Sequence, residues 1–252
     1  MFLRILHPWV TALNPSTRLS ALDGAAPAGA SSSRGAASRL PLSVPALLLA
    51  AAMLLPFGMP WLAGAVSAPV SLLTRDPVAV GNLPPWTGLL STLGLCAWAA
   101  AATVALFAGA WVRERGGATA VPAGWFFGAG ALSVVLLLDD AFLAHEILLP
   151  VFVGIPEKAV YAMYGLAALA WFVGGLRFLR GTPWLLLGIA GLGFAASVVI
   201  DVVSGDNDPA FTVLLEDGAK WIGIAAWAAY LSATAWSAVA PVPTAASGDR
   251  RG

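Results

Sequence analysis

The sequence has little charge, little histidine and almost no cysteine. Only 10% of its 252 residues are charged, whereas a soluble domain carries about 25% charged residues. Its 13 Lys and Arg residues balance 13 Asp and Glu residues, so it has no basic field that would attract nucleic acid. One Cys and two His exclude an internal disulfide, a Cys-rich zinc module and an iron–sulfur site.

Long apolar stretches are what the sequence has instead. Hydrophobic residues make up 59% of the chain, and the mean hydropathy is +0.84. Six segments reach the length of about 20 apolar residues that a membrane helix needs. These segments are 41–66, 86–112, 123–147, 157–178, 183–204 and 212–238. The sequence therefore predicts an all-α integral membrane bundle of six transmembrane helices, with the lipid bilayer as its partner.

The composition divides the chain into three regions. Residues 1–39 begin with Phe2, Leu6, Trp9 and Leu13 at helical spacing and continue as a stretch rich in Ala, Ser, Gly and Pro. The first pattern is typical of an amphipathic helix and the second of disorder. We expect a transmembrane domain over 40–240 and a disordered tail over 241–252.

The basic residues predict the orientation. Ten of the 13 cations fall on one side of the predicted spans: Arg4, Arg18, Arg34, Arg39, Arg113, Arg115, Arg177, Arg180, Arg250 and Arg251. The positive-inside rule places this side, and with it both termini, in the cytoplasm. The expected location is therefore the inner (plasma) membrane. Ten of the 13 acids fall in the outer half or the outer loops.

Two adjacent aspartates interrupt the third apolar segment. Asp139 and Asp140 follow the run Ser-Val-Val-Leu-Leu-Leu, and His145 and Glu146 come within the next two turns. A carboxylate at the centre of a membrane helix costs roughly 2.5–3.5 kcal/mol and is placed there by default for function. On a continuous helix, Asp139 and Glu146 would share one face, because they are seven residues apart.

The next three predicted spans also carry polar side chains on one face. At helical spacing these are Glu157, Tyr161 and Tyr164 on the fourth, Ser197 and Asp201 on the fifth, and Glu216, Asp217 and Lys220 on the sixth. If the four faces converge, they form an outward-facing acidic pocket with one imidazole and one ammonium group. We expect Lys220 to be the internal counter-charge.

The leading hypothesis is that this pocket binds a divalent metal ion as cofactor. Carboxylates with one imidazole suit such an ion, and the candidate ligands are Asp140, His145, Glu146, Asp201 and Glu216. Asp139, Asp140 and Lys220 are the candidate catalytic residues. The residues expected to support the ligands by hydrogen bonds are Glu157, Tyr161, Tyr164, Ser197 and Asp217. A metal-bound water could then hydrolyse a lipid-like substrate.

Three alternatives remain open at this point. The ionisable groups could form the path of a proton- or cation-coupled transporter or channel, or they could serve only to hold the helices of a structural or accessory protein together. In the third alternative Lys220 carries a Schiff-base chromophore, because Glu216 to Lys220 resembles the last helix of microbial rhodopsins. That family has seven helices, whereas this sequence predicts six. Whether the protein is an enzyme, what it acts on and whether it forms a homo-oligomer also stay open.

Three motifs resemble an uncharacterised family of bacterial multipass membrane proteins. They are Leu-Asp-Asp-Ala-Phe-Leu-Ala-His-Glu, ending at Glu146; Ile-Pro-Glu-Lys-Ala-Val-Tyr, ending at Tyr161; and Glu-Asp-Gly-Ala-Lys-Trp-Ile-Gly-Ile-Ala-Ala-Trp, ending at Trp227. The resemblance covers about residues 123–232. It supports the clustering of these motifs and implies no activity.

Overall fold

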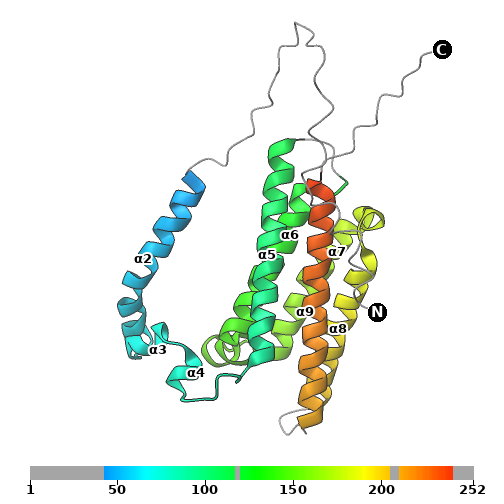
Figure 1. Ribbon diagram of the computed structural model, residues 1–252. Helices are drawn as coiled ribbons and strands as arrows, with labels where there is room; N and C mark the ends of the chain where they lie inside the picture. The colour runs from blue at the N-terminus through cyan, green and yellow to red at the C-terminus, as the bar shows by residue number, and fades with distance from the viewer. Residues whose placement is uncertain (1–42, 117–119, 205–209, 241–252) are drawn as a thin grey trace, which may run out of the picture. The chain divides into compact units, whose positions relative to one another are not determined.

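The computed structural model describes residues 43–116, 120–204 and 210–240, and the regular structure within them is helical (Figure 1). The predicted segments 1–39 and 241–252 lie outside the described residues. Numbered as in Figure 1, the elements are α2 (Ser43–Ala65), α3 (Val70–Thr74), α4 (Pro77–Val80), α5 (Leu89–Arg115), α6 (Ala123–Phe142), the π-helix η4 (Ala144–Val153), α7 (Glu157–Gly175), the 3₁₀-helix η5 (Leu176–Gly181), α8 (Trp184–Ser204) and α9 (Ala210–Val239).

The predicted all-α, multipass membrane character is confirmed. Within the described residues, five helical segments are long and apolar enough to cross a membrane: Leu89–Arg115, Ala123–Phe142, Glu157–Gly181, Trp184–Ser204 and Ala210–Val239. The remaining predicted span, 41–66, falls on α2, which is not among these five. A sixth span, cytoplasmic termini and the choice of membrane stay predictions.

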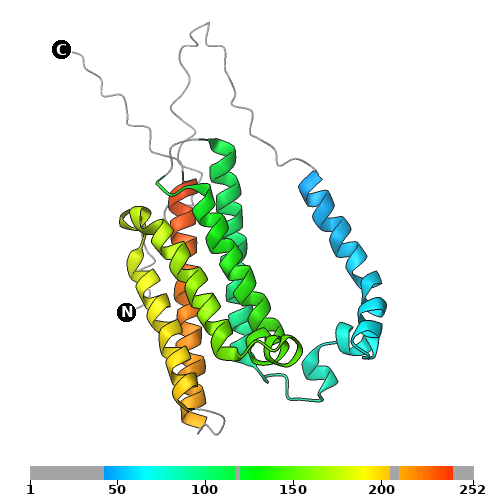
Figure 2. The same ribbon diagram turned by 180° about the vertical axis from the view of Figure 1, so that it is seen from behind.

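Helices α5 to α9 pack against one another through a small set of neighbours (Figure 1, Figure 2). α9 lies between α5 and α8, and α5 also contacts α6. α7 contacts α6 and the two short helices beside it, η4 and η5. The short connections make sequence neighbours antiparallel. The C-terminal part of α6 therefore lies at the same end of the bundle as the start of α7.

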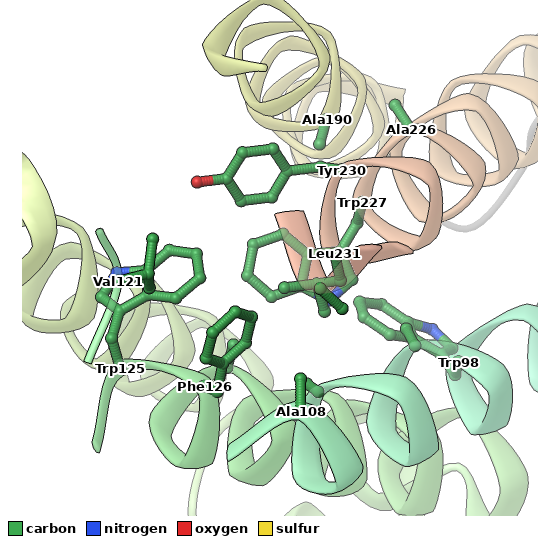
Figure 3. Close-up of a cluster of buried hydrophobic side chains, with 14 of the residues drawn as sticks. Trp98, Ala108, Val121, Trp125, Phe126, Ala190, Ala226, Trp227, Tyr230 and Leu231 are labelled. Carbon is green, nitrogen blue, oxygen red and sulfur yellow. The ribbon is translucent and has the colours of Figure 1, made fainter. Parts of the chain in front are cut away.

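Aromatic side chains from α6 and α9 fill the core (Figure 3). The ring of Trp125 packs edge-on to that of Tyr230, with 5.9 Å between centroids. The indole N–H of Trp227 donates a hydrogen bond of 2.9 Å to Ser133 Oγ, so this buried polar group is satisfied. On the facing side α5 presents alanines, including the fully buried Ala105. Small residues on one helix thus make room for large rings on the others.

A glycine contact brings α8 and α9 to backbone distance. A Cβ atom added to Gly193 would lie 2.7 Å from the backbone nitrogen of Gly223 and 2.8 Å from the carbonyl oxygen of Ala219. Small residues at such positions let membrane helices pack closely by van der Waals contact. No larger residue fits Gly193 unless the helices move apart.

We therefore expect Gly193→Ala to destabilise the protein by about 1–3 kcal/mol, the usual cost of overpacking. Gly165→Ala is the matched control, because a Cβ atom at this position on α7 meets nothing within 4 Å. Thermal unfolding of the two variants in the same detergent measures the difference. Equal melting temperatures would contradict the close approach of α8 and α9.

Candidate functional site

Helix α6 ends at Phe142, two residues after the second aspartate. Leu143 has a left-handed backbone, with φ of 51°, and η4 begins at the next residue. The sequence prediction of one continuous helix over 123–147 is therefore wrong, and so is the expectation that Asp139 and Glu146 share a helix face. A left-handed leucine is uncommon, so the surrounding contacts must hold this turn.

The carboxylate of Asp139 holds the turn. Its Oδ1 accepts a hydrogen bond of 2.9 Å from the backbone N–H of His145, and its Oδ2 lies 2.6 Å from Nδ1 of the same residue. Oδ1 also accepts a hydrogen bond of 2.9 Å from the hydroxyl of Tyr164 on α7. Asp139 and His145 are each 5% exposed. The side chain of one aspartate thus joins α6, η4 and α7.

Asp140 is held by two residues from other helices. Its Oδ1 lies 2.7 Å from Nζ of Lys220 on α9, and its Oδ2 accepts a hydrogen bond of 2.8 Å from the indole N–H of Trp98 on α5. Lys220 is therefore placed as the internal counter-charge that the sequence suggests. The two neighbouring aspartates point to different cations, which reduces the repulsion between their charges.

A third group joins the start of α7 to the end of α8. The hydroxyl of Tyr161 lies 3.2 Å from Glu157 Oε1 and 3.1 Å from Asp201 Oδ2. The ring of Tyr161 also packs against the imidazole of His145, with 5.1 Å between centroids. The contact with His145 connects this group to the group around Asp139, and Asp140 follows Asp139 in the chain. We call the combined set the polar network: Trp98, Asp139, Asp140, His145, Glu146, Glu157, Tyr161, Tyr164, Asp201 and Lys220.

His145 lies between two carboxylates. Its Nδ1 contacts Asp139, and its Nε2 lies 3.4 Å from Oε1 of the exposed Glu146. Burial by itself would lower the pKa of His145, but the contacts with Asp139 and Glu146 and their negative charges raise it to about 9. The contact with His145 in turn lowers the pKa of Glu146. The imidazole is therefore a cation at neutral pH.

This proton makes stability depend on pH. The folded-state pKa of His145, about 9, exceeds its ordinary value of 6.5, so its contribution is complete below pH 6.5 and is lost as the pH rises through about 9. We expect the melting temperature to fall across this range, and to fall less in His145→Gln. Thermal unfolding of both proteins at several pH values is the measurement, and parallel curves would contradict the assignment.

Other candidate residues take different places. Ser197 is buried in α8, Asp217 is exposed on α9, and Glu216, also on α9, is half-buried and has an interaction partner. Within residues 43–116, 120–204 and 210–240, no three His, Cys, Asp or Glu side chains are arranged to hold a metal ion. Divalent-cation binding stays a prediction, and elemental analysis of protein purified without chelators would test it.

An apolar cavity of about 710 Å³ adjoins the polar network. Its walls come mainly from α6, α7 and α8, and Trp98 of α5 and Trp227 of α9 also line it. Tyr164 lines its end at the network. Trp184 lines the other end. Val135 and Leu169, in the middle of α6 and α7, also line the cavity and are exposed, so the cavity opens sideways. Trp98 and Tyr164 thus belong to the cavity and the network alike.

Residues 42–234 match the family described as "Domain of unknown function (DUF8692)". The chain belongs to this family. The DUF8692 region contains every residue of the polar network and of the cavity. No curated protein and no solved structure matches the chain. The resemblance to an uncharacterised family, which the three motifs suggest, is thereby confirmed.

Sequence reasoning missed two features of the DUF8692 domain. Trp98 looks like one of many tryptophans in an apolar span, yet its indole N–H binds Asp140. The cavity has no signal in any single helix, because its walls are built from ordinary apolar and small residues of α5 to α9 and η5. A partial signal for Trp98 exists: a buried indole N–H usually finds an acceptor, and polar acceptors are few in an apolar bundle.

Proposed function

We propose that this DUF8692 protein is a membrane-embedded binding protein for a lipid-soluble molecule, which occupies the cavity between α6, α7 and α8. The observation that carries the proposal is the junction of the cavity with the polar network at Trp98 and Tyr164. An apolar pocket that meets a few fixed polar groups is the usual form of a small-molecule site.

The size and walls of the cavity support this proposal. Its volume of about 710 Å³ falls within the range of roughly 300–1,000 Å³ typical of ligand pockets. Aromatic rings of Trp171, Phe194 and Trp227 alternate in its walls with small residues such as Gly188. Its walls belong to segments apolar enough to cross a membrane. A molecule that enters the cavity between these helices therefore comes from the lipid phase.

The polar network closes one end of this site. Asp139 and Asp140 accept hydrogen bonds from Tyr164 and Trp98, and the His145 and Lys220 cations balance the two carboxylates. Both donors are thereby fixed in place. A hydrolytic or transport activity, as weighed from the sequence, would use the same groups, and both activities stay predictions.

Filling the cavity is expected to abolish binding. Gly188 lines the cavity, and a Cβ atom added there meets nothing within 4 Å, so Gly188→Leu should project into the space without displacing a helix. The probe is a phosphatidylcholine with a photoreactive diazirine at the end of one acyl chain. After irradiation in bilayers, mass spectrometry measures labelling of Trp98 and Trp227, which are 2% and 7% exposed.

We expect the wild type to be labelled at these two tryptophans, and Gly188→Leu to reduce the labelling about tenfold, equivalent to roughly 1–2 kcal/mol of lost packing. Gly165→Leu is the control, because Gly165 also has free space around it but does not line the cavity. Absence of label on both tryptophans in the wild type would overturn the proposal, as would equal labelling of the two variants.

A further inference from the structure

We infer that the cavity takes an anionic phospholipid from one leaflet, with the phosphate group at Arg180 and one acyl chain pointing toward Tyr164. This inference rests on the proposed function and adds the class of ligand, its leaflet and its orientation.

A second hollow lies at the far end of the cavity. It has a volume of about 390 Å³ and is lined by Leu179, Arg180 and Trp184. Leu179 and Trp184 also line the cavity. The two spaces therefore adjoin, and a molecule can place a polar group in the hollow while its apolar part fills the cavity.

Arg180 gives the hollow its charge preference. Its side chain is exposed, and within the described part of the chain no carboxylate lies within ion-pair distance of it. A guanidinium group presents paired donors that match the oxygens of a phosphate. Trp184 beside it is typical of the membrane interface, where headgroups lie.

Three other arginines have different contacts at their side chains. The guanidinium of Arg113 lies 5.3 Å from the ring centroid of Phe127, that of Arg115 lies 4.2 Å from Trp111, and that of Arg177 lies 4.5 Å from Phe178. None of these three arginines lines the cavity or the hollow. Arg180 is thus the cation placed at the mouth of the site, and Arg115 offers a control with the same charge.

The opposite end of the cavity repels an anionic headgroup. The polar network there contains five carboxylates, Asp139, Asp140, Glu146, Glu157 and Asp201, and two cationic groups, Lys220 and His145. The charge distribution therefore sets one orientation, with the phosphate group at Arg180 and the chain end at the network.

The length of the cavity fits one leaflet. Along α8 its wall runs from Trp184 to Phe194, a rise of about 15 Å at 1.5 Å per residue. The hydrocarbon core of a bilayer is about 30 Å thick, so the cavity reaches about half-way across. A lipid of the leaflet at Arg180 can therefore insert one chain without lifting its headgroup from the interface.

The test compares two diazirine lipids that differ only in the headgroup, phosphatidylglycerol and phosphatidylcholine, in bilayers containing the full chain. We expect phosphatidylglycerol to label Trp98 about fivefold more than phosphatidylcholine, the preference expected from one arginine facing an anionic headgroup. Arg180→Gln should bring the ratio to about one, while Arg115→Gln should leave it unchanged. Free glycerol phosphate should not compete, because it lacks the chain that fills the cavity.

The possible outcomes separate the two proposals. Equal labelling by both lipids in the wild type, or an equal loss in the two arginine variants, would overturn the assignment of the headgroup to Arg180 and leave the cavity proposal standing. Competition by free glycerol phosphate would identify a soluble phosphate ligand in place of a lipid. Absence of labelling by either lipid would overturn both proposals.

Discussion

Asp139→Ala is expected to destabilise the protein by about 4 kcal/mol, within the range for breaking a buried charge pair. The carboxylate accepts hydrogen bonds from the backbone and the ring of His145 and from Tyr164. Removing it leaves a buried imidazolium, a backbone N–H and a hydroxyl without this acceptor. It also removes the contact that holds the left-handed turn at Leu143.

Thermal unfolding in detergent, with Glu146→Ala as the control, measures this effect. Glu146 also contacts His145, at 3.4 Å, but its side chain is 48% exposed, so water replaces the lost contact and the cost should stay below about 1 kcal/mol. A loss of similar size in both variants would show that the turn does not depend on the buried carboxylate.

Lys220→Met is expected to cost about 3 kcal/mol, the lower end of the range for breaking a buried pair. The side chain of Asp140 is 15% exposed and that of Lys220 is 36% exposed, so some of the lost interaction is recovered by solvent. The variant retains the apolar stem but leaves the charge of Asp140 with only the indole N–H of Trp98.

The double variant Asp140→Asn with Lys220→Met tests the cause. Because it removes both charges, it should be more stable than Lys220→Met alone, and a double-mutant cycle gives the coupling energy. Lys158→Met, on the exposed side of α7, controls for the loss of one positive charge. A double variant as unstable as the single one would show that packing, and not charge, holds Lys220.

The sequence predicts part of the polar network but not its geometry. Asp139, His145 and Lys220 are visible because ionisable residues in apolar helices must find partners. The break at Leu143 has no such signal, since leucine does not favour a left-handed turn and only the tertiary contacts of Asp139 reveal it. The prediction of one helix over 123–147 is wrong for this reason. The prediction of long apolar helices is confirmed, because the length of an apolar segment is enough to predict one.

The cavity could not be predicted because it is a property of the arrangement of the helices. Gly188 and Ala168 line it, and small residues in a membrane helix ordinarily indicate close packing. That interpretation holds at Gly193, where the backbones of α8 and α9 touch. The same interpretation fails at Gly188, less than two turns away on α8. There α7 packs on α6 and leaves the facing side of α8 uncovered.

The unequal packing of α7 and α8 has a mechanical consequence. The backbone contact at Gly193 couples α8 and α9 into a stiff pair, since any separation breaks many van der Waals contacts at once. α7 instead packs mainly on α6 and its own flanking helices, and its hydrogen bond to α8, from Tyr161 to Asp201, lies at the network end of the cavity. Of the two side walls of the cavity, α7 is therefore the compliant one. A bulky ligand would widen the cavity by displacing α7, while the wall formed by α8 keeps its shape.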